Sequence, residues 1–263
     1  MSYDLAGNIA LVTASSSGLG KASAEVFADS DANVVVNGRD TDQLEETIDE
    51  LRAQGNGEVI GVSGDLTEAS DISELVEDTV SEFGGIDHLV TSAGGPPSGQ
   101  FLELTDDDWQ EAFDLLVMSV VRLVRESAPH LRQSEAGTIV NITSRSVKEA
   151  IPSLVLSNSV RMSVIGLEKT LSKELAPEIR ANAVLPGPHE TSRIENLIEA
   201  GVERGEYDDY EDGLATRGEG NPLGRIGDPR ELGELVAFLS SERSSYLNGV
   251  AITVDGGGSA SNL

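Results

Sequence analysis

The stretch that decides the fold is NIALVTASSSGLGKASAEVF, which runs from Asn8 to Phe27. Ile9 to Val12 is a short apolar run of the kind that forms a buried parallel strand, and small residues follow it before a helical pattern begins. The first turn of such a helix offers unpaired backbone N–H groups and the positive end of the helix dipole, and Gly18 and Gly20 allow the backbone to come close. The segment therefore predicts a pyrophosphate site, although an ordinary strand-to-helix turn would use the same residues.

A second apolar strand, Asn33 to Asn37, follows after one helix and completes a βαβ unit of the size that dinucleotide-binding folds use. At this point the chain resembles the short-chain dehydrogenase/reductase family, whose nucleotide turn reads TGxxxGxG. TASSSGLG matches that turn from Thr13 to Gly20, with Ala14 in place of the first glycine. The cofactor contacts that the resemblance implies in this turn are Thr13, Ser15, Ser16, Ser17, Gly18, Leu19 and Gly20.

The resemblance covers essentially the whole chain and implies a single domain over residues 1–263. We expect a single-domain α/β fold, a Rossmann-type doubly wound parallel sheet with helices on both faces. The chain has 263 residues, 38% of them hydrophobic, which is enough to bury one core.

The charge of the chain is extreme, because 46 acidic residues stand against 18 Lys and Arg and give a formal net charge of −28. Spread along the chain, these charges predict a solvated acidic surface that repels nucleic acid and anionic lipid. Molar salt screens such repulsion, so we expect a protein from a salt-adapted (halophilic) cell.

Several absences narrow the chemistry and the location. No run of eighteen apolar residues occurs, and the N-terminal MSYDLAGN lacks the regions of an export signal, so we expect no membrane span and a cytoplasmic protein. Without cysteine there is no disulfide, thiolate metal site or cysteine nucleophile. His88, His130 and His189 are scattered, so we expect no metal site.

Arg39 stands at the end of the second strand, where a dinucleotide fold meets the adenosine ribose. A carboxylate there accepts hydrogen bonds from a free 2′-hydroxyl, whereas an arginine accommodates a 2′-phosphate. Gly38 occupies the place where NAD-dependent members of the resembled family usually carry Asp. The sequence therefore favours NADP, with NAD still possible because Asp40 is adjacent, and the alternative for Arg39 is a solvated surface cation.

The following segment adds further expected contacts to the cofactor. Thr41 is expected to cap a helix, after which a third strand leads to Asp65 and Leu66. The resemblance places Asp65 near the adenine, and the alternative is a cap for a helix that begins near Thr67. It also implies backbone contacts after the fourth strand, at Ser92, Ala93 and Gly94.

A long helix is predicted from Thr105 to Arg132. Its middle, AFDLLVMSVVRLV, is apolar on nearly every face, so one face packs on the sheet and another needs a partner. In the resembled family the partner is another subunit, which predicts a homo-oligomer, most simply a tetramer. The catalytic asparagine of the family is replaced by Leu116.

Gly137 to Ser144 is predicted to form the strand that ends at the cleft, and Ser144 matches the catalytic serine of the family. Thirteen residues later the family has Tyr-x-x-x-Lys, and Ser157 and Arg161 occupy those places. Four residues apart on a helix, the two side chains share a face. A guanidinium can hold ribose hydroxyls but does not shuttle protons, and a serine is far less acidic than a phenol.

The missing acid/base has three candidates. Lys148 lies four residues after Ser144 on a loop expected at the cleft, where desolvation would lower a lysine pKa, although an exposed lysine fits equally. Asn158 can form hydrogen bonds but cannot exchange protons. His189 has a suitable pKa but also fits an ordinary polar loop residue.

ANAVLPGPHET, from Ala181 to Thr191, resembles the VNxxxPGxxxT segment of the family. Pro186 and Gly187 are expected to shape its turn, and Thr191 to meet the nicotinamide carboxamide. The acidic, glycine-punctuated residues 192–222 predict a mobile substrate lid.

Two classes of function remain open. The first is an NADP-dependent oxidoreductase, similar to 3-oxoacyl carrier-protein reductases, that moves a hydride between nicotinamide and a small-molecule carbonyl or alcohol. The second is a nucleotide-binding or scaffolding protein that kept the fold and lost the chemistry. The retained frame of the cleft favours the enzyme, with a catalytic set of Ser144, Lys148, Ser157 and Arg161.

Overall fold

The computed structural model describes residues 3–262 of the chain. Seven strands occur in this range, β1 Ile9–Val12, β2 Asn33–Gly38, β3 Val59–Ser63, β4 His88–Thr91, β5 Thr138–Ile142, β6 Arg180–Pro186 and β7 Ala251–Val254. The α-helices described are α1 Gly18–Asp29, α2 Thr41–Arg52, α3 Ala69–Phe83, α4 Asp106–Phe113, α5 Ser119–Leu131, α6 Val155–Glu174, α7 Ser192–Glu203, α8 Tyr210–Gly218 and α9 Pro229–Ser240. Shorter helical turns are η1 Phe101–Glu103, the π-helical η2 Asp114–Met118, η3 Arg145–Val147 and η4 Glu242–Ser244.

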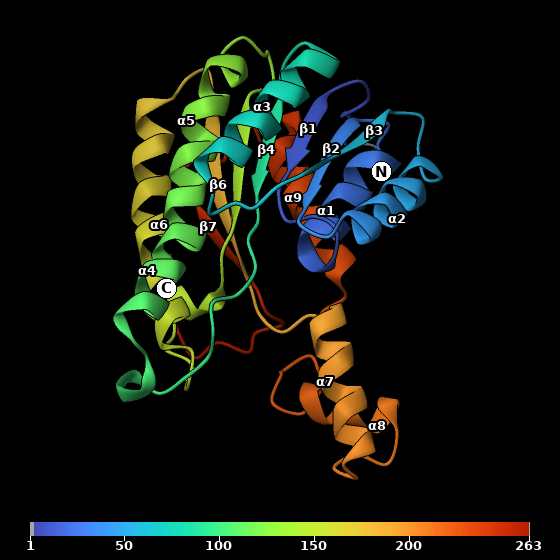
Figure 1. Ribbon diagram of the computed structural model, residues 1–263, viewed down its shortest axis with the longest axis vertical. Helices are drawn as coiled ribbons and strands as arrows, with labels where there is room; N and C mark the ends of the chain where they lie inside the picture. Colours follow the sequence, from blue (N-terminus) through green and yellow to red (C-terminus); the bar gives the residue numbers. More distant parts are fainter. Residues whose placement is uncertain (1–2, 263) are drawn as a thin grey trace.

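The strands form one parallel sheet in the order β3-β2-β1-β4-β5-β6-β7. Both faces of the sheet are buried, because successive side chains of a strand point to opposite faces: Leu11 belongs to one core cluster, and Ala10 and Val12 belong to the other. Helices α4, α5 and α6 lie on one side of the sheet and α1, α2 and α9 on the other (Figure 1). The predicted α/β, Rossmann-type doubly wound sheet is confirmed.

Three local expectations differ from the structure. Helix α2 is capped by Asp40, whose carboxylate accepts hydrogen bonds from the backbone N–H groups of Asp42 and Gln43, so Thr41 is the first helical residue and not the cap. Helix α3 begins at Ala69, later than expected, because Asp65 bonds the backbone and hydroxyl of Thr67 in a turn before it.

The helix predicted from Thr105 to Arg132 is interrupted. Thr105 caps α4 as expected, with a hydrogen bond between its hydroxyl and the backbone N–H of Asp108. The helix then widens into the π-helical turn η2 before α5 continues. Such turns are often found at functional sites, and this one contains Leu116.

Residues 192–222 contain two helices, α7 and α8, which extend away from the sheet in Figure 1. The segments that enter and leave this region lie side by side, because the backbone of Gly227 exchanges hydrogen bonds with Pro188 and Glu190. In the part of the chain that the structure describes, no helix is long and apolar enough to cross a membrane.

Candidate active site

The residues predicted to bind and react gather at the carboxyl ends of the central strands. The sheet order places β1 between β2 and β4. Strands β2 and β3 are therefore added on one side of β1, and β4 to β7 on the other side. Open parallel sheets bind ligands in the crevice at such a reversal of strand order. The sequence-predicted residues that follow these strands therefore lie along the edge of the sheet at which such a crevice forms.

The glycine turn after β1 has the geometry of a phosphate-binding loop. Gly18 has φ of +59°, in the left-handed region that favours glycine. A Cβ atom on Gly20 would lie 2.3 Å from the carbonyl oxygen of Ala14, so only glycine fits there. Ser17 stands at the start of α1 and its side chain makes no capping bond, which leaves the first N–H groups of the helix available.

Ala14 is the unusual member of this turn. Its φ is +46°, a conformation that costs a residue with a Cβ atom roughly 1–2 kcal/mol. The family pattern has glycine at this position for the same physical reason. The turn therefore keeps its shape with alanine, at a cost in backbone strain.

Two of the predicted contacts have buried side chains that brace the turn. The Ser15 hydroxyl donates to the carbonyl oxygen of Val12, at 2.6 Å, and accepts from the backbone N–H of Asn37. The Thr13 hydroxyl donates to the carbonyl oxygen of Ser92, at 2.7 Å. Buried Asn37, which the sequence analysis did not single out, accepts from the N–H of Ala14 and donates to the carbonyl oxygens of Val62 and Gly64 at the end of β3. These side chains hold β1, β2 and β4 together beneath the cleft.

The remaining side chains of the turn are half-buried or carry no Cβ atom. Ser16 accepts a hydrogen bond at its carbonyl oxygen from the hydroxyl of Thr47, at 3.0 Å. Leu19 packs against the core cluster beneath α1 and α9.

Arg39 lies at the end of β2 with 78% of its side chain exposed and forms an ion pair with Asp65, at 3.5 Å. The carboxyl pKa of Asp65 is lowered, chiefly by the hydrogen bond from the backbone of Thr67 and in smaller part by Arg39. A Cβ atom on Gly38 would lie 2.7 Å from the Ser16 hydroxyl, so this position has no room for an aspartate. Leu66 is buried in the core, which leaves only its backbone for a ligand.

The segment after β4 contacts helix α6. Ser92 and Ala93 are half-buried, and Gly94 is exposed. The carbonyl oxygen of Gly94 accepts a hydrogen bond from Nη2 of Arg161, at 3.2 Å. Arg161 is 8% exposed, and burial lowers its pKa to about 10. The structure thus brings the predicted ribose cation to the segment predicted to line the cofactor cleft.

Hydrogen bonds connect Ser144, Ser146 and Ser157. Ser144 Oγ accepts from the backbone N–H of Ser146, at 3.1 Å, and caps the short turn η3. Ser146 Oγ lies 2.9 Å from Ser157 Oγ, and both side chains are buried. Ser146 was missed in the sequence, where nothing distinguished it from the other serines of the loop.

The three candidates for the acid/base are placed differently from one another. Lys148 is exposed, so it lacks the desolvation on which its proposed reactivity depends. Asn158 uses its amide to bond both backbone groups of Ile151, which fixes the loop before α6. His189 is buried beside Gly227, and burial is the main cause that lowers its pKa and favours the neutral ring.

The loop after β6 closes over the glycine turn. Gly187 lies so close to Asp255 that a Cβ atom would be 2.5 Å from its side chain, and its backbone N–H donates to Val254. Pro186 is the last residue of β6. The methyl group of Thr191 lies 3.7 Å from where a Cβ atom of Gly18 would be. Thr191 therefore lies close to Gly18 in the glycine turn.

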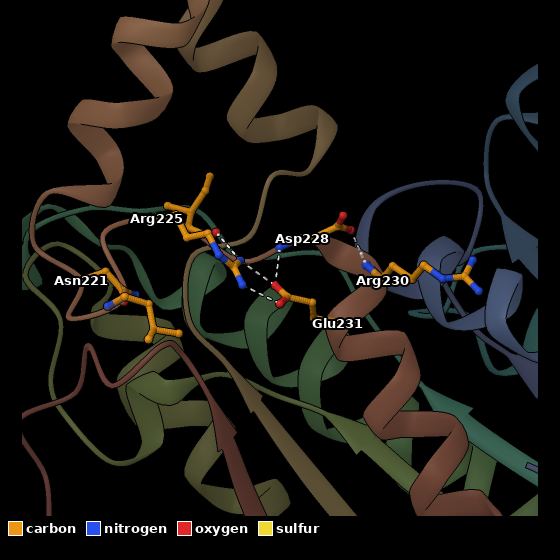
Figure 2. Close-up of polar contacts among 7 residues, drawn as sticks. Asn221, Arg225, Asp228, Arg230 and Glu231 are labelled. Atoms are coloured by element: carbon orange, nitrogen blue, oxygen red, sulfur yellow. Dashed lines mark hydrogen bonds and ion pairs between the residues drawn. The ribbon is translucent and has the colours of Figure 1, made fainter. Parts of the chain in front are cut away.

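A separate cavity of about 510 Å³ lies between α8 and the start of α9, and none of the predicted site residues lines it. Arg225 in its wall forms two hydrogen bonds to the carboxylate of Glu231, at 2.7 and 2.6 Å, and the N–H of Asp228 bonds the same carboxylate (Figure 2). These contacts fasten the segment between α8 and α9 to the start of α9.

A buried polar chain behind the cleft was also missed in the sequence. Thr91 donates to Asn141 at 2.6 Å, and Asn141 donates to the carboxyl group of Glu168. Spacing along the chain gives no sign of this contact, because the three residues lie on β4, β5 and α6. Among residues 3–262 no cluster of potential metal ligands is found.

Comparisons with known proteins agree with this architecture. The sequence description of enoyl-(acyl carrier protein) reductases matches residues 13–259. The chain is 32% identical over 253 residues to dehydrogenase/reductase SDR family member 4 of Caenorhabditis elegans, with 95% of both chains covered. It is 32% identical over 255 residues to 3-oxoacyl-[acyl-carrier-protein] reductase FabG of Thermotoga maritima, which covers 96% of this chain and 98% of the relative. The crystal structure of L-sorbose reductase from Gluconobacter frateurii, complexed with NADPH and L-sorbose, superposes with a TM-score of 0.93 at 32% identity and 98% coverage of both chains.

Proposed function

Because the chain belongs to the short-chain dehydrogenase/reductase family of oxidoreductases, we propose that it is an NADP(H)-dependent oxidoreductase in which Ser157 and Arg161 replace the usual tyrosine and lysine. The substrate class is a small-molecule carbonyl or alcohol. The observation that carries the proposal is the buried guanidinium of Arg161, which reaches from α6 to the carbonyl oxygen of Gly94. It puts a fixed cation beside the cleft at the position of the missing lysine.

The cleft fits a nicotinamide dinucleotide. Gly18 and Gly20 open the backbone at the helix α1 N-terminus for a pyrophosphate, and Gly94 has open space where a Cβ atom would be. Arg39 is exposed at the end of β2, where a 2′-phosphate can replace Asp65 as its partner. The NADPH complex of the sorbose reductase supports the same choice of cofactor.

When bound, the cofactor supplies or accepts the hydride. The chain's own residues orient the substrate and handle charge. Ser144 Oγ already accepts from the N–H of Ser146, so its proton is free to donate to a substrate oxygen. Arg161 holds the ribose and stabilises negative charge, and an ordered water exchanges the proton, since Lys148 is exposed.

One observation favours the second candidate, a nucleotide-binding protein without turnover. The Ser157 hydroxyl is engaged by Ser146, and Lys148 is exposed, so no titratable side chain stands at the place of the phenol. A screen of carbonyl and alcohol substrates with NADPH and NADP in molar salt separates the two. Cofactor binding without turnover on any substrate would favour the second candidate.

The proposal extends to two further features. Residues 192–222 form a substrate lid, supported by the paired entry and exit segments at Pro188 and Gly227. A homo-oligomer, most simply a tetramer, is supported by Phe113 on α4 and Met162 on α6, which are 41% and 49% exposed on neighbouring helices. Light scattering in molar salt tests the assembly against the 27.7 kDa mass of one chain.

A further inference from the structure

A buried carboxyl group fastens the catalytic helix to the sheet. Glu168 is 2% exposed, and its Oε2 accepts a hydrogen bond from Nδ2 of Asn141. The Asn141 carbonyl oxygen accepts in turn from the hydroxyl of Thr91, at 2.6 Å. The chain of bonds therefore joins α6, β5 and β4, the three elements that lead to Arg161, Ser144 and Gly94.

The second oxygen of this carboxyl group is unpaired. Oε1 of Glu168 is buried and receives no hydrogen bond from any residue in the range 3–262. A buried carboxylate with one amide donor is costly, whereas a protonated carboxyl keeps the bond to Asn141 and carries no charge. Burial raises the pKa of Glu168 to about 8, so the group holds a proton at neutral pH.

The charged groups around Glu168 do little to lower its pKa. Lys169 on the same helix and the bond from Asn141 favour ionisation, but both effects are smaller than that of burial. Helix α6 packs against α4, η2, η3 and β6. The other charged groups on these elements and on α6 itself do not shift the pKa of Glu168 appreciably. They are Asp106, Asp107, Asp108, Glu111, Asp114, Arg145, Arg161, Lys173, Glu174 and Arg180.

We propose that Glu168 is a positioning residue that keeps α6 in its cofactor-binding position only while it carries a proton. Arg161 lies about 10 Å before Glu168 along the same helix, as seven residues at the helical rise require. An ionised Glu168 requires hydration, which its 2% exposure denies while α6 stays bonded to Asn141 on β5. The inference rests on the proposed function in one respect, since Arg161 is taken to contact the cofactor.

The test is the affinity for NADPH, measured by titration in molar potassium chloride at about pH 7 and about pH 9. With a pKa of about 8, the protonated fraction falls from roughly nine tenths to roughly one tenth, so the dissociation constant should rise about tenfold. Glu168→Gln mimics the protonated carboxyl and should bind NADPH equally at both values. Glu174→Gln, an exposed change of the same charge on the same helix, should behave as the unaltered protein.

The pH window is suited to this measurement, because the chain has no cysteine and buried His88 has its pKa lowered to about 4. A purely structural hydrogen bond would give no midpoint near pH 8. Equal affinities at both pH values in the unaltered protein would overturn the proposal. A tenfold rise in the dissociation constant for NADPH that persists in Glu168→Gln would also overturn the proposal.

A second measurement separates this inference from the proposed function. If NADPH fails to bind at every pH, the proposed function is wrong, and urea unfolding then decides the role of Glu168 alone. A carboxyl whose pKa is higher folded than unfolded stabilises the fold at low pH and loses this effect as pH rises through the folded value. The free energy of unfolding should therefore fall from about pH 5 to about pH 8 in the unaltered protein. An equal fall in the free energy of unfolding of Glu168→Gln would overturn the proposal. If that variant does not fold, a free energy of unfolding that stays constant with pH in the unaltered protein would overturn it.

Discussion

Ser146 Oγ and Ser157 Oγ lie 2.9 Å apart and are buried together behind the turn η3. Ser157 stands where the resembled family places a phenol, but its hydroxyl is directed to another serine. Ser144 is bonded through its acceptor side, by the N–H of Ser146 at 3.1 Å. The two serines at the site therefore differ: the Ser144 proton is available to a substrate, whereas buried Ser157 shares a hydrogen bond with Ser146 in which either hydroxyl can donate.

We expect Ser144→Ala and Arg161→Ala to lower kcat more than they lower cofactor affinity. Removing one oriented donor at a reacting oxygen costs about a hundredfold in kcat. Ser157→Ala removes a neutral hydrogen bond away from the substrate, worth about 1 kcal/mol, so its effect should stay within roughly tenfold. Steady-state kinetics with matched NADPH titrations measure both quantities.

Two results would contradict this division of roles. One is a Ser157→Ala variant as impaired as Ser144→Ala, which would make Ser157 the reacting hydroxyl. The other is an Arg161→Ala variant that loses NADPH affinity and turnover in equal proportion, which would make Arg161 a binding residue only. Ser163→Ala, an exposed change on the same helix, is the matched control.

Arg39 should determine the preference for NADPH over NADH. A charge-assisted bond between its guanidinium and a 2′-phosphate contributes about 1.4 kcal/mol at an exposed site, which is about tenfold in affinity. Arg39→Ala should therefore weaken NADPH by about this factor and leave NADH unchanged. Calorimetric titration at fixed salt measures the two affinities.

The controls for this prediction come from the same strand end and from a distant surface. Arg243→Ala removes an exposed arginine on η4 and should leave both affinities as they were. Gly38→Asp should weaken both cofactors, because a side chain there meets the Ser16 hydroxyl at 2.7 Å. An unchanged ratio of NADPH to NADH affinity in Arg39→Ala would mean that Arg39 is only a solvated cation.

The sheet and the glycine turn could be predicted because both depend on local patterns of sequence. Short apolar runs followed by small residues produce buried parallel strands and open turns, whatever the rest of the chain does. The contact between Asn141 and Glu168 could not be predicted, since it joins residues 27 positions apart on different elements. The π-helical turn at Leu116 likewise depends on how α4 and η2 pack against α6, which hydrophobic periodicity does not encode.

At Ala14 the sequence departs from the motif, although the backbone keeps a conformation that favours glycine. The sequence has alanine at a glycine position, and the backbone still adopts φ of +46°. Ala14→Gly should stabilise the fold by roughly 0.5–1 kcal/mol, because relief of about 1–2 kcal/mol of strain exceeds the entropy that glycine adds to the unfolded chain. Urea unfolding in molar salt measures the change.

The matched control is Ala128→Gly, which lies within helix α5 and should destabilise by roughly 0.5–1 kcal/mol. If Ala14→Gly destabilised the protein as much as Ala128→Gly does, strain at Ala14 would be ruled out. The NADPH affinity of Ala14→Gly should change little, because the carbonyl oxygen of Ala14 already faces Gly20 in the conformation that glycine would adopt.

Salt should stabilise this protein. The net charge is −28, and the cationic side chains that form ion pairs include Lys21, Arg39, Arg52, Arg204, Arg225 and Arg230. These pairs are mostly exposed and contribute about 0–1 kcal/mol each, so their screening by salt costs little. Repulsion among the excess carboxylates acts over about 30 Å at 0.01 M salt and only about 3 Å at 1 M. The melting temperature should therefore rise as potassium chloride increases from dilute buffer to the molar range.

Replacing surface carboxylates tests whether repulsion is the cause. Glu45 and Glu46 are exposed on α2 and take part in no ion pair found in the described chain. Glu45→Gln with Glu46→Gln should raise the melting temperature in dilute buffer and reduce its dependence on salt, while the value in molar salt stays nearly the same. A larger gain in molar salt than in dilute buffer would point instead to a change in helix propensity. A melting temperature that is flat from dilute to molar salt in the unaltered protein would rule out self-repulsion as a determinant of its stability.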